Sequence, residues 1–328
     1  MIKKILDRVV PVTQNGSALA AIFISAMLGL IATLFCVWWL RTYGLVLFVF
    51  GPFVMGWISA SLYGYHAWRP YKSTIGVASL SILVLVTLLI LVGGEGAICL
   101  IMSLPLAIPI AILGATIGHE RQTRQPKDQA KKIIPLFIIL MPLLMGAEYA
   151  VQPQPKVLPV KSYVDIDAPV EVVWKNVIAF PALPEPKGGI FSTGIAYPKY
   201  ASIKGTGVGA VRECHFSTGA FIEPVTVWDE NKLLRFDVTS QPAPMKELSP
   251  YGDIHTPHMD NYLQSKQGQF LLTQLPDGKI RLEGTTWYSN KMWPETYWRV
   301  WSDYIIQEIH LRVLEHIKTI SEELVVMK

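Results

Sequence analysis

Cysteine and charge are both scarce in this sequence. Its three cysteines, Cys36, Cys99 and Cys214, lie far apart, so they provide neither a CxxC zinc pair nor a disulfide framework. Charged residues make up 16% of the 328 residues, compared with about 25% in an ordinary soluble protein. Hydrophobic residues make up 51%. This balance excludes a small disulfide-stabilised protein and predicts that part of the chain lies in a membrane.

Long apolar runs fill the first half of the chain. Residues 17–40 contain no charged side chain and are long enough to cross about 30 Å of hydrocarbon. This run is too long for the core of a signal peptide and no A-x-A site follows it, so we expect an uncleaved anchor. The sequence predicts a bundle of about five transmembrane helices, at residues 17–40, 44–65, 74–93, 96–118 and 133–150.

The charges between these runs predict an orientation. Ten lysines and arginines fall on one side of the predicted spans, and only Arg41 falls on the other. The ten are Lys3, Lys4, Arg8, Arg69, Lys72, Arg121, Arg124, Lys127, Lys131 and Lys132. Positive loops stay in the cytoplasm, so five crossings place the C-terminal half outside, which is the periplasm for a bacterial inner membrane. The basic stretch 121–132 is then an inside loop, and we expect no nucleic-acid partner.

The bundle itself has little that indicates transport. Only Glu95 and Glu148 approach the predicted spans, and both fall at predicted ends. Charges inside a membrane usually mark ion or substrate paths, and there is no obvious inverted repeat. We therefore expect the helices to serve as an anchor and scaffold in the lipid bilayer.

The second half has the pattern of a folded domain. Residues 151–160 are rich in proline and predict an extended tether, and 161–328 predict strands and helices. Asp167-Ala168-Pro169 begins a short helix after a first strand, several alternating strands follow, and Pro294 ends the last one. A helix of roughly twenty-five residues closes the chain, with an apolar stripe from Trp298 to Ile320. The order predicts an α+β fold, a curved antiparallel sheet packed on the long C-terminal helix.

Three segments of this half carry a family resemblance. They are VDIDAPVEVVWKNV, GVGAVRECHFSTGAFIEPVTVWDENKLLRFDV and GQFLLTQLPDGKIRLEGTTWYSNKMWPETYW. Together they resemble a polyketide cyclase/dehydrase-type domain of the START-like (SRPBCC) superfamily over about 158–324. The resemblance implies a helix-grip fold with a ligand cavity between the sheet and the last helix. That superfamily contains lipid carriers, hormone receptors, cyclases and chaperone activators, so the fold alone does not choose a function.

Strand alternation predicts which side chains face this cavity. The predicted lining is Glu223, Leu234, Phe236, Val238, Phe270, Leu272, Leu282, Thr286 and Tyr288 from the strands, with Trp298, Trp301 and Ile305 from the helix. Mostly apolar walls with a few polar groups are typical of a site for a hydrophobic small molecule. The same residues would also serve as an ordinary core.

Glu213, His215 and Tyr288 are the candidate catalytic residues. Glu213 and His215 share one face of a strand, with Glu223 on the next strand. If that face is inward, a carboxylate and an imidazole lie in the cavity and could transfer protons. If it is outward, they form a solvated ladder and Arg212 takes the inner side, because a slip of one residue reverses the whole set.

The segment 241–264 predicts a lid, with Tyr251, His255, His258 and Met259 as its members. The two histidines lack the helical spacing of an HExxH zinc site, so we expect no metal. Residues 205–210 fit a loose G-x-G-x-x-A pattern but lead into a strand, so a dinucleotide site is excluded and no cofactor is expected.

Three hypotheses follow. The first is a membrane-anchored module that binds a hydrophobic small molecule or lipid. The second is a cyclase- or dehydratase-like enzyme that uses Glu213, His215 or Tyr288. The third is a non-catalytic interaction or sensor protein whose interior is filled. A cavity of roughly 300 Å³ or more would separate the first two from the third.

Overall fold

The computed structural model describes residues 2–122, 126–151, 154–252, 256, 259 and 262–326. The chain forms two compact units. Unit 1 comprises Met1–Pro153 together with Leu248–Pro257 and Met292–Tyr297, and unit 2 comprises Gln154–Glu247, His258–Lys291 and Trp298–Lys328. The division is therefore not a single cut near residue 155, because two short segments from the second half belong to the helical unit.

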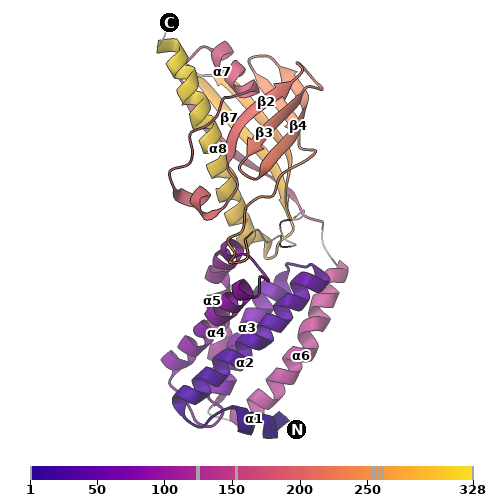
Figure 1. Ribbon diagram of the computed structural model, residues 1–328, viewed down its shortest axis with the longest axis vertical. Helices are drawn as coiled ribbons and strands as arrows, with labels where there is room; N and C mark the ends of the chain where they lie inside the picture. Colours follow the sequence, from indigo (N-terminus) through magenta and orange to yellow (C-terminus); the bar gives the residue numbers. More distant parts are fainter. Residues whose placement is uncertain are drawn as a thin grey trace. The chain divides into compact units, whose positions relative to one another are not determined.

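Unit 1 is helical (Figure 1). Its helices are α1 (Ile2–Val9), α2 (Gln14–Leu34), η1 (Phe35–Leu40), η2 (Val46–Phe50), α3 (Gly51–Tyr63), α4 (Tyr71–Leu91), α5 (Ala97–Gln122) and α6 (Pro126–Val151). Five stretches are long and apolar enough to cross a membrane: Gln14–Leu40, Val46–Tyr63, Tyr71–Leu91, Ala97–Gln122 and Ala130–Val151. Prolines occur inside α5 and α6, as membrane helices tolerate.

Glu148 of α6 binds the chain segment that connects the first two of these stretches. Arg41 ends η1 in the left-handed conformation, and the chain turns through Gly44. The Glu148 carboxylate of α6 accepts hydrogen bonds from the backbone N–H of Leu45 at 2.6 Å and of Val46 at 3.3 Å. A side chain at position 44 would collide with this carboxylate, since an added Cβ would lie 2.2 Å from it. Glu148 thus caps a helix start.

Unit 2 is built on one curled antiparallel sheet of seven strands, which confirms the predicted sheet. The strands are β1 (Val157–Ile166), β2 (Pro198–Lys204), β3 (Val211–Phe216), β4 (Gly219–Asp229), β5 (Leu233–Asp237), β6 (Leu263–Gln274) and β7 (Ile280–Asn290). Their order in the sheet is β1-β7-β6-β5-β4-β3-β2. Irregular pairing next to Val225 in β4 and Ser265 in β6 helps the sheet to curl.

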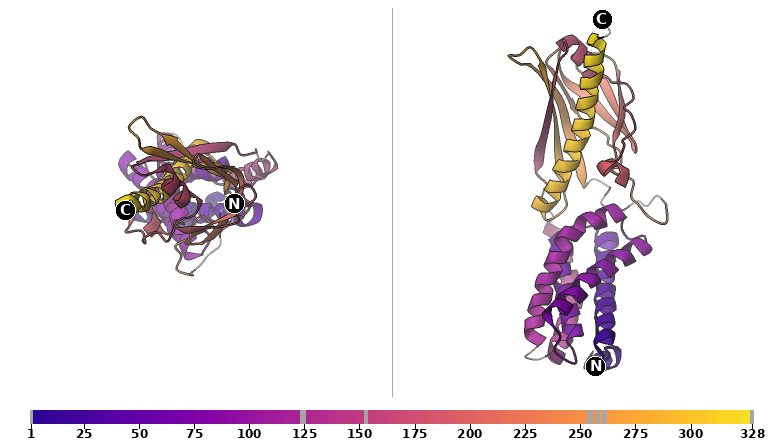
Figure 2. Two further views of the ribbon diagram at one scale, coloured as in Figure 1. Left: turned by 90° about the horizontal axis from the view of Figure 1, so that it is seen from above. Right: turned by 90° about the vertical axis from the view of Figure 1, so that its left-hand side faces the viewer.

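The C-terminal helix α8 (Glu295–Val326) lies along the concave side of this sheet, with α7 (Val170–Ile178) near one end (Figure 1). The right-hand view of Figure 2 shows strands on both sides of α8, so the sheet wraps around it. Val313, Leu314 and Ile317 of α8 are buried in the main core with residues of α7 and of all seven strands. Ile306, near the middle of α8, packs in a second cluster with Val160 and Tyr288.

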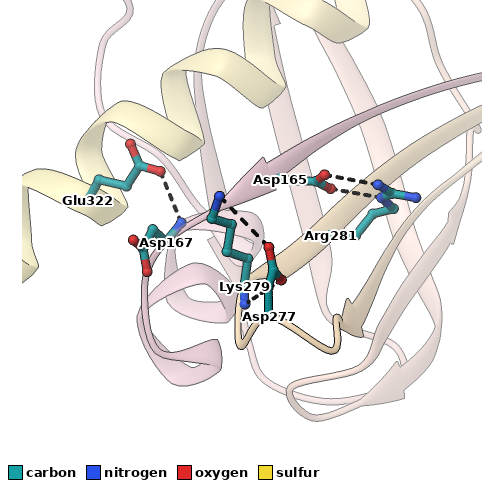
Figure 3. Close-up of polar contacts among 6 residues, drawn as sticks. All are labelled: Asp165, Asp167, Asp277, Lys279, Arg281 and Glu322. Atoms are coloured by element: carbon teal, nitrogen blue, oxygen red, sulfur yellow. Dashed lines mark hydrogen bonds and ion pairs between the residues drawn. The ribbon is translucent and has the colours of Figure 1, made fainter.

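Polar contacts fasten the far end of α8 to the sheet (Figure 3). Glu322 accepts a hydrogen bond from the backbone N–H of Asp167 at 3.0 Å. Beside it, Arg281 of β7 donates two hydrogen bonds to Asp165 of β1, at 2.8 and 2.9 Å. These bonds hold the pKa of Asp165 below its usual range. The end of α8 is thereby fixed next to the edge pair of strands.

Candidate functional site

Unit 2 contains a cavity of about 110 Å³ between the sheet and the middle of α8. Its helical wall runs from Ile306 to Leu314. Those two residues also belong to the two separate apolar clusters that hold α8 on the sheet. The cavity is therefore the space that remains where the helix bridges between its two packed regions.

Four phenylalanines form the aromatic part of the apolar wall. Phe216, Phe221, Phe236 and Phe270, from four different strands, all line the cavity, and we call them the phenylalanine wall. Gly268 makes room for one of them, because a Cβ at that position would lie 2.4 Å from the Phe236 ring. Such a wall suits a flat apolar ligand, since aromatic rings pack well edge to face or offset.

A buried ion pair lies in the same cavity. Arg212 of β3 and Glu223 of β4 are register partners, with 1% and 6% of their surfaces exposed, and the guanidinium donates a hydrogen bond to Glu223 Oε2. The Arg212 Nε also donates to the Ile178 carbonyl at 3.3 Å. The guanidinium carbon lies 5.3 to 5.6 Å from the ring centres of Phe180, Phe236 and Phe270.

Burial and the neighbouring charges shift the pKa values of Glu223, Arg212 and Cys214. It raises the pKa of Glu223 above its usual range, although the Arg212 charge opposes this. Burial, the largest influence on Arg212, would lower its pKa, but the charges and hydrogen bonds of Glu223 and Cys214 together outweigh it and raise the pKa. Burial also raises the pKa of the Cys214 thiol to about 12, so this cysteine is protonated and unreactive.

Glu213 and His215 lie on the other face of β3, so the hypothesis that they face the cavity is wrong. Glu213 instead pairs with Lys204 at 2.8 Å, and His215 stacks on Tyr200 with ring centres 4.3 Å apart. The register places Arg212, Cys214 and Phe216 inward. The signal was in the sequence, because Cys214 and Phe216 are the apolar members of this strand's alternation.

Tyr288, the third candidate, is buried but does not line the cavity. Its hydroxyl donates to Asp303 Oδ1 at 2.6 Å. Burial and this hydrogen bond raise the pKa of Tyr288. The hydroxyl is thereby held between β7 and α8 and is not directed at a ligand.

The other predicted lining residues divide into two groups. The structure places Glu223, Phe236, Val238, Phe270 and Thr286 around the cavity. It places Leu234, Leu272 and Leu282 in the main core, and Trp298, Trp301 and Ile305 outside the lining. The helical wall starts at Ile306, because the turn before it packs on the end of β7 through Ser302 and Asp303.

His310 is a lining residue that sequence reasoning missed. Its Nε2 forms a 2.7 Å hydrogen bond with the Thr286 hydroxyl, and its Nδ1 is buried without a partner among the residues described. Burial lowers the pKa of His310 to about 4, so the ring is neutral near pH 7. The stripe pattern predicts His310 beside the apolar stripe rather than on it, and its position next to Ile309 of that stripe is the only signal that it is buried.

The predicted lid is only partly described. His255 and His258 lie outside the described residues. Tyr251 belongs to unit 1, where its hydroxyl donates to the Leu91 carbonyl, so it is not a lid residue of the cavity. Met259 is buried and does not line the cavity. Within the described part of the chain, no group of three or more histidine, cysteine and acidic side chains could hold a metal ion.

No protein-family model matches the sequence, and no curated protein matches it either. Among solved structures, an aromatase/cyclase from Streptomyces sp. R1128 is 12% identical over 52% of this chain and 96% of its own, with a TM-score of 0.34. Norcoclaurine synthase from Thalictrum flavum is 11% identical over 52% and 96%, with a TM-score of 0.32. A protein from Nitrosospira multiformis is 18% identical over 50% and 96%, also at 0.32. Similarities this low do not bear on function.

Breaking the buried ion pair should destabilise unit 2, and replacing both partners should restore it. We expect Arg212→Met or Glu223→Leu alone to cost about 3–5 kcal/mol, because each leaves an uncompensated buried charge. The double variant should recover most of that loss. Thermal unfolding of the full-length protein in detergent, followed by near-UV circular dichroism, measures this. Lys204→Met with Glu213→Gln, on the outer face of the same sheet, is the matched control and should show little coupling. Additive single effects at Arg212 and Glu223 would contradict the prediction.

His310 should make unit 2 less stable in acid. Its pKa is lowered on folding from about 6.5 to about 4, so the folded state binds this proton less well. The associated stability is complete above pH 6.5 and is lost as the pH falls towards 4, by about 2–3 kcal/mol. We expect His310→Gln to flatten this part of the stability profile relative to the wild type. Leu314→Ala, a buried neighbour that does not titrate, should lower stability at every pH without changing the slope. Equal slopes in wild type and His310→Gln would refute the assignment.

Proposed function

We propose that this protein is anchored in a membrane and binds a small hydrophobic molecule in the cavity of unit 2. The observation that carries the proposal is a cavity with an aromatic wall and a buried ion pair, left open where the sheet and helix are otherwise closely packed. Ligand pockets typically combine apolar surfaces with a few polar groups that fix orientation.

The volume supports a ligand of about one ring. It is well below the roughly 300 Å³ of pockets for drug-sized molecules. It is of the same order as a buried apolar cavity of about 150 Å³ that binds benzene. A whole lipid needs far more space, so the proposed ligand is a compact hydrophobic molecule rather than a lipid.

None of the three candidate catalytic residues, Glu213, His215 and Tyr288, lines the cavity. Glu213 and His215 face away from the cavity, and the Tyr288 hydroxyl is held by Asp303. The unreactive Cys214 adds no nucleophile. The cavity of about 110 Å³ is smaller than the roughly 300 Å³ set above, so its volume does not separate binding from the third hypothesis, an interaction or sensor protein. The aromatic wall and the buried ion pair that line the space favour binding. Binding is therefore the function that the geometry favours.

Filling the cavity should weaken the binding of a one-ring apolar probe. Val238 lines the cavity, so Val238→Phe should displace fluorobenzene and weaken its binding to full-length protein at least tenfold. Fluorine NMR titration in detergent measures this, and the detergent background cancels between variants. Val208→Phe, at a residue 68% exposed and outside the cavity, is the matched control and should bind like the wild type. Equal binding by all three proteins would mean that fluorobenzene does not enter the cavity.

The proposed orientation has the N-terminus in the cytoplasm and unit 2 in the periplasm of a bacterial inner membrane. Five candidate spans and the ten-to-one distribution of basic residues support it. A reporter enzyme that is active only outside the cytoplasm should be active when fused after Lys328, and inactive when fused after Gln122. The reverse pattern would contradict the proposed orientation.

A further inference from the structure

We infer that the molecule bound by unit 2 is an uncharged one-ring compound with a hydroxyl group, of the phenol class, whose hydroxyl donates a hydrogen bond to Glu223 Oε1. The inference rests on the proposed function and adds the chemical class of its ligand.

Glu223 presents one free acceptor to the cavity. Its Oε2 receives the Arg212 guanidinium, whereas its Oε1 accepts no hydrogen bond from the residues described. Glu223 lines the cavity, and its Oε1 remains accessible although no described residue donates a hydrogen bond to it. Glu223 is 6% exposed as a residue, and only one of its two carboxylate oxygens accepts a hydrogen bond. Its Oε1 therefore favours a donor from the ligand, since leaving a buried acceptor unpaired costs free energy.

The charges around Glu223 favour a neutral donor. Arg212 and Glu223 cancel each other, so a ligand ammonium would bring an unbalanced charge into a low-dielectric space and meet the guanidinium's repulsion. An anionic ligand would face Glu223, and Arg212 is already bonded to Glu223 and to the Ile178 carbonyl. A hydroxyl satisfies the acceptor without adding charge.

The phenylalanine wall determines the rest of the ligand. Phe221 lies on β4 two residues before Glu223, and its ring is 4.8 Å from that of Phe216. The opposite part of the wall comes from Phe236 and Phe270, whose rings are 6.2 Å apart. A ring placed among these four, with its hydroxyl towards Glu223, fits both the volume and the chemistry of the cavity.

The test compares three probes of similar size on the full-length protein in detergent by fluorine NMR. These are 4-fluorophenol, fluorobenzene, which lacks the hydroxyl, and 4-fluorobenzylamine, which carries a positive charge. We expect 4-fluorophenol to bind about tenfold more tightly than fluorobenzene, because a hydrogen bond to a charged acceptor is among the stronger ones. The amine should bind more weakly than either. The cavity-filling variant Val238→Phe gives the background for each probe.

The double variant Arg212→Met/Glu223→Leu removes the acceptor without stranding a charge. It should still bind fluorobenzene but lose the tenfold preference for 4-fluorophenol. Glu213→Gln, which changes an acid on the outer face of β3, should keep the preference. Equal affinity of the wild type for phenol and benzene probes, or tighter binding of the amine, overturns the inference and leaves the proposed function intact. Failure of every probe to bind above the Val238→Phe background overturns the proposed function itself.

Discussion

Two opposite charges enclosed by aromatic rings govern the design of unit 2. Neither Arg212 nor Glu223 is stable in this apolar interior alone, since an unpaired buried charge costs several kcal/mol. They are held because β3 and β4 pair in one register, which brings the two residues opposite each other. The turn between Phe216 and Gly219 sets that register, and Gly219 supplies a positive φ of 146°. A shift by one residue would expose the pair and bury Glu213 in its place.

The ion pair and the cavity are two results of the same packing. Helix α8 is held on the sheet at Ile306 by one cluster and from Val313 to Ile317 by another. Between these two regions the side chains of α8 do not fill all the space enclosed by the curved sheet, and the cavity remains. Unfilled apolar space destabilises a fold in proportion to its volume, so a ligand that occupies it recovers stability. The site therefore links ligand binding directly to the packing of the C-terminal helix.

Periodicity was enough to predict the fold but not the site. The curled antiparallel sheet and the C-terminal helix follow from alternating strands and from a stripe that includes Trp298, Val313 and Ile317, because burial of one face imposes those patterns. The site depended on which face of β3 is inward, a choice between Cys214 with Phe216 and Glu213 with His215. Glu213 and His215 suggested catalysis on the face that proves to be outward. The burial of apolar side chains determines which face of a strand is inward.

A small cavity is physically coherent with the proposed anchoring in a membrane. A ligand of about eight non-hydrogen atoms has a limited binding free energy, with an upper bound of about 1.5 kcal/mol per atom and commonly much less. One-ring hydroxyl compounds partition into bilayers, so their concentration near a membrane exceeds that in bulk water. In the proposed function, the five candidate spans of unit 1 tether unit 2 to a membrane. Anchoring then compensates for modest affinity, because occupancy depends on local concentration relative to the dissociation constant. On this view the helices contribute to binding by tethering unit 2, and Glu148, which caps a helix start, fits a structural role rather than a transport path.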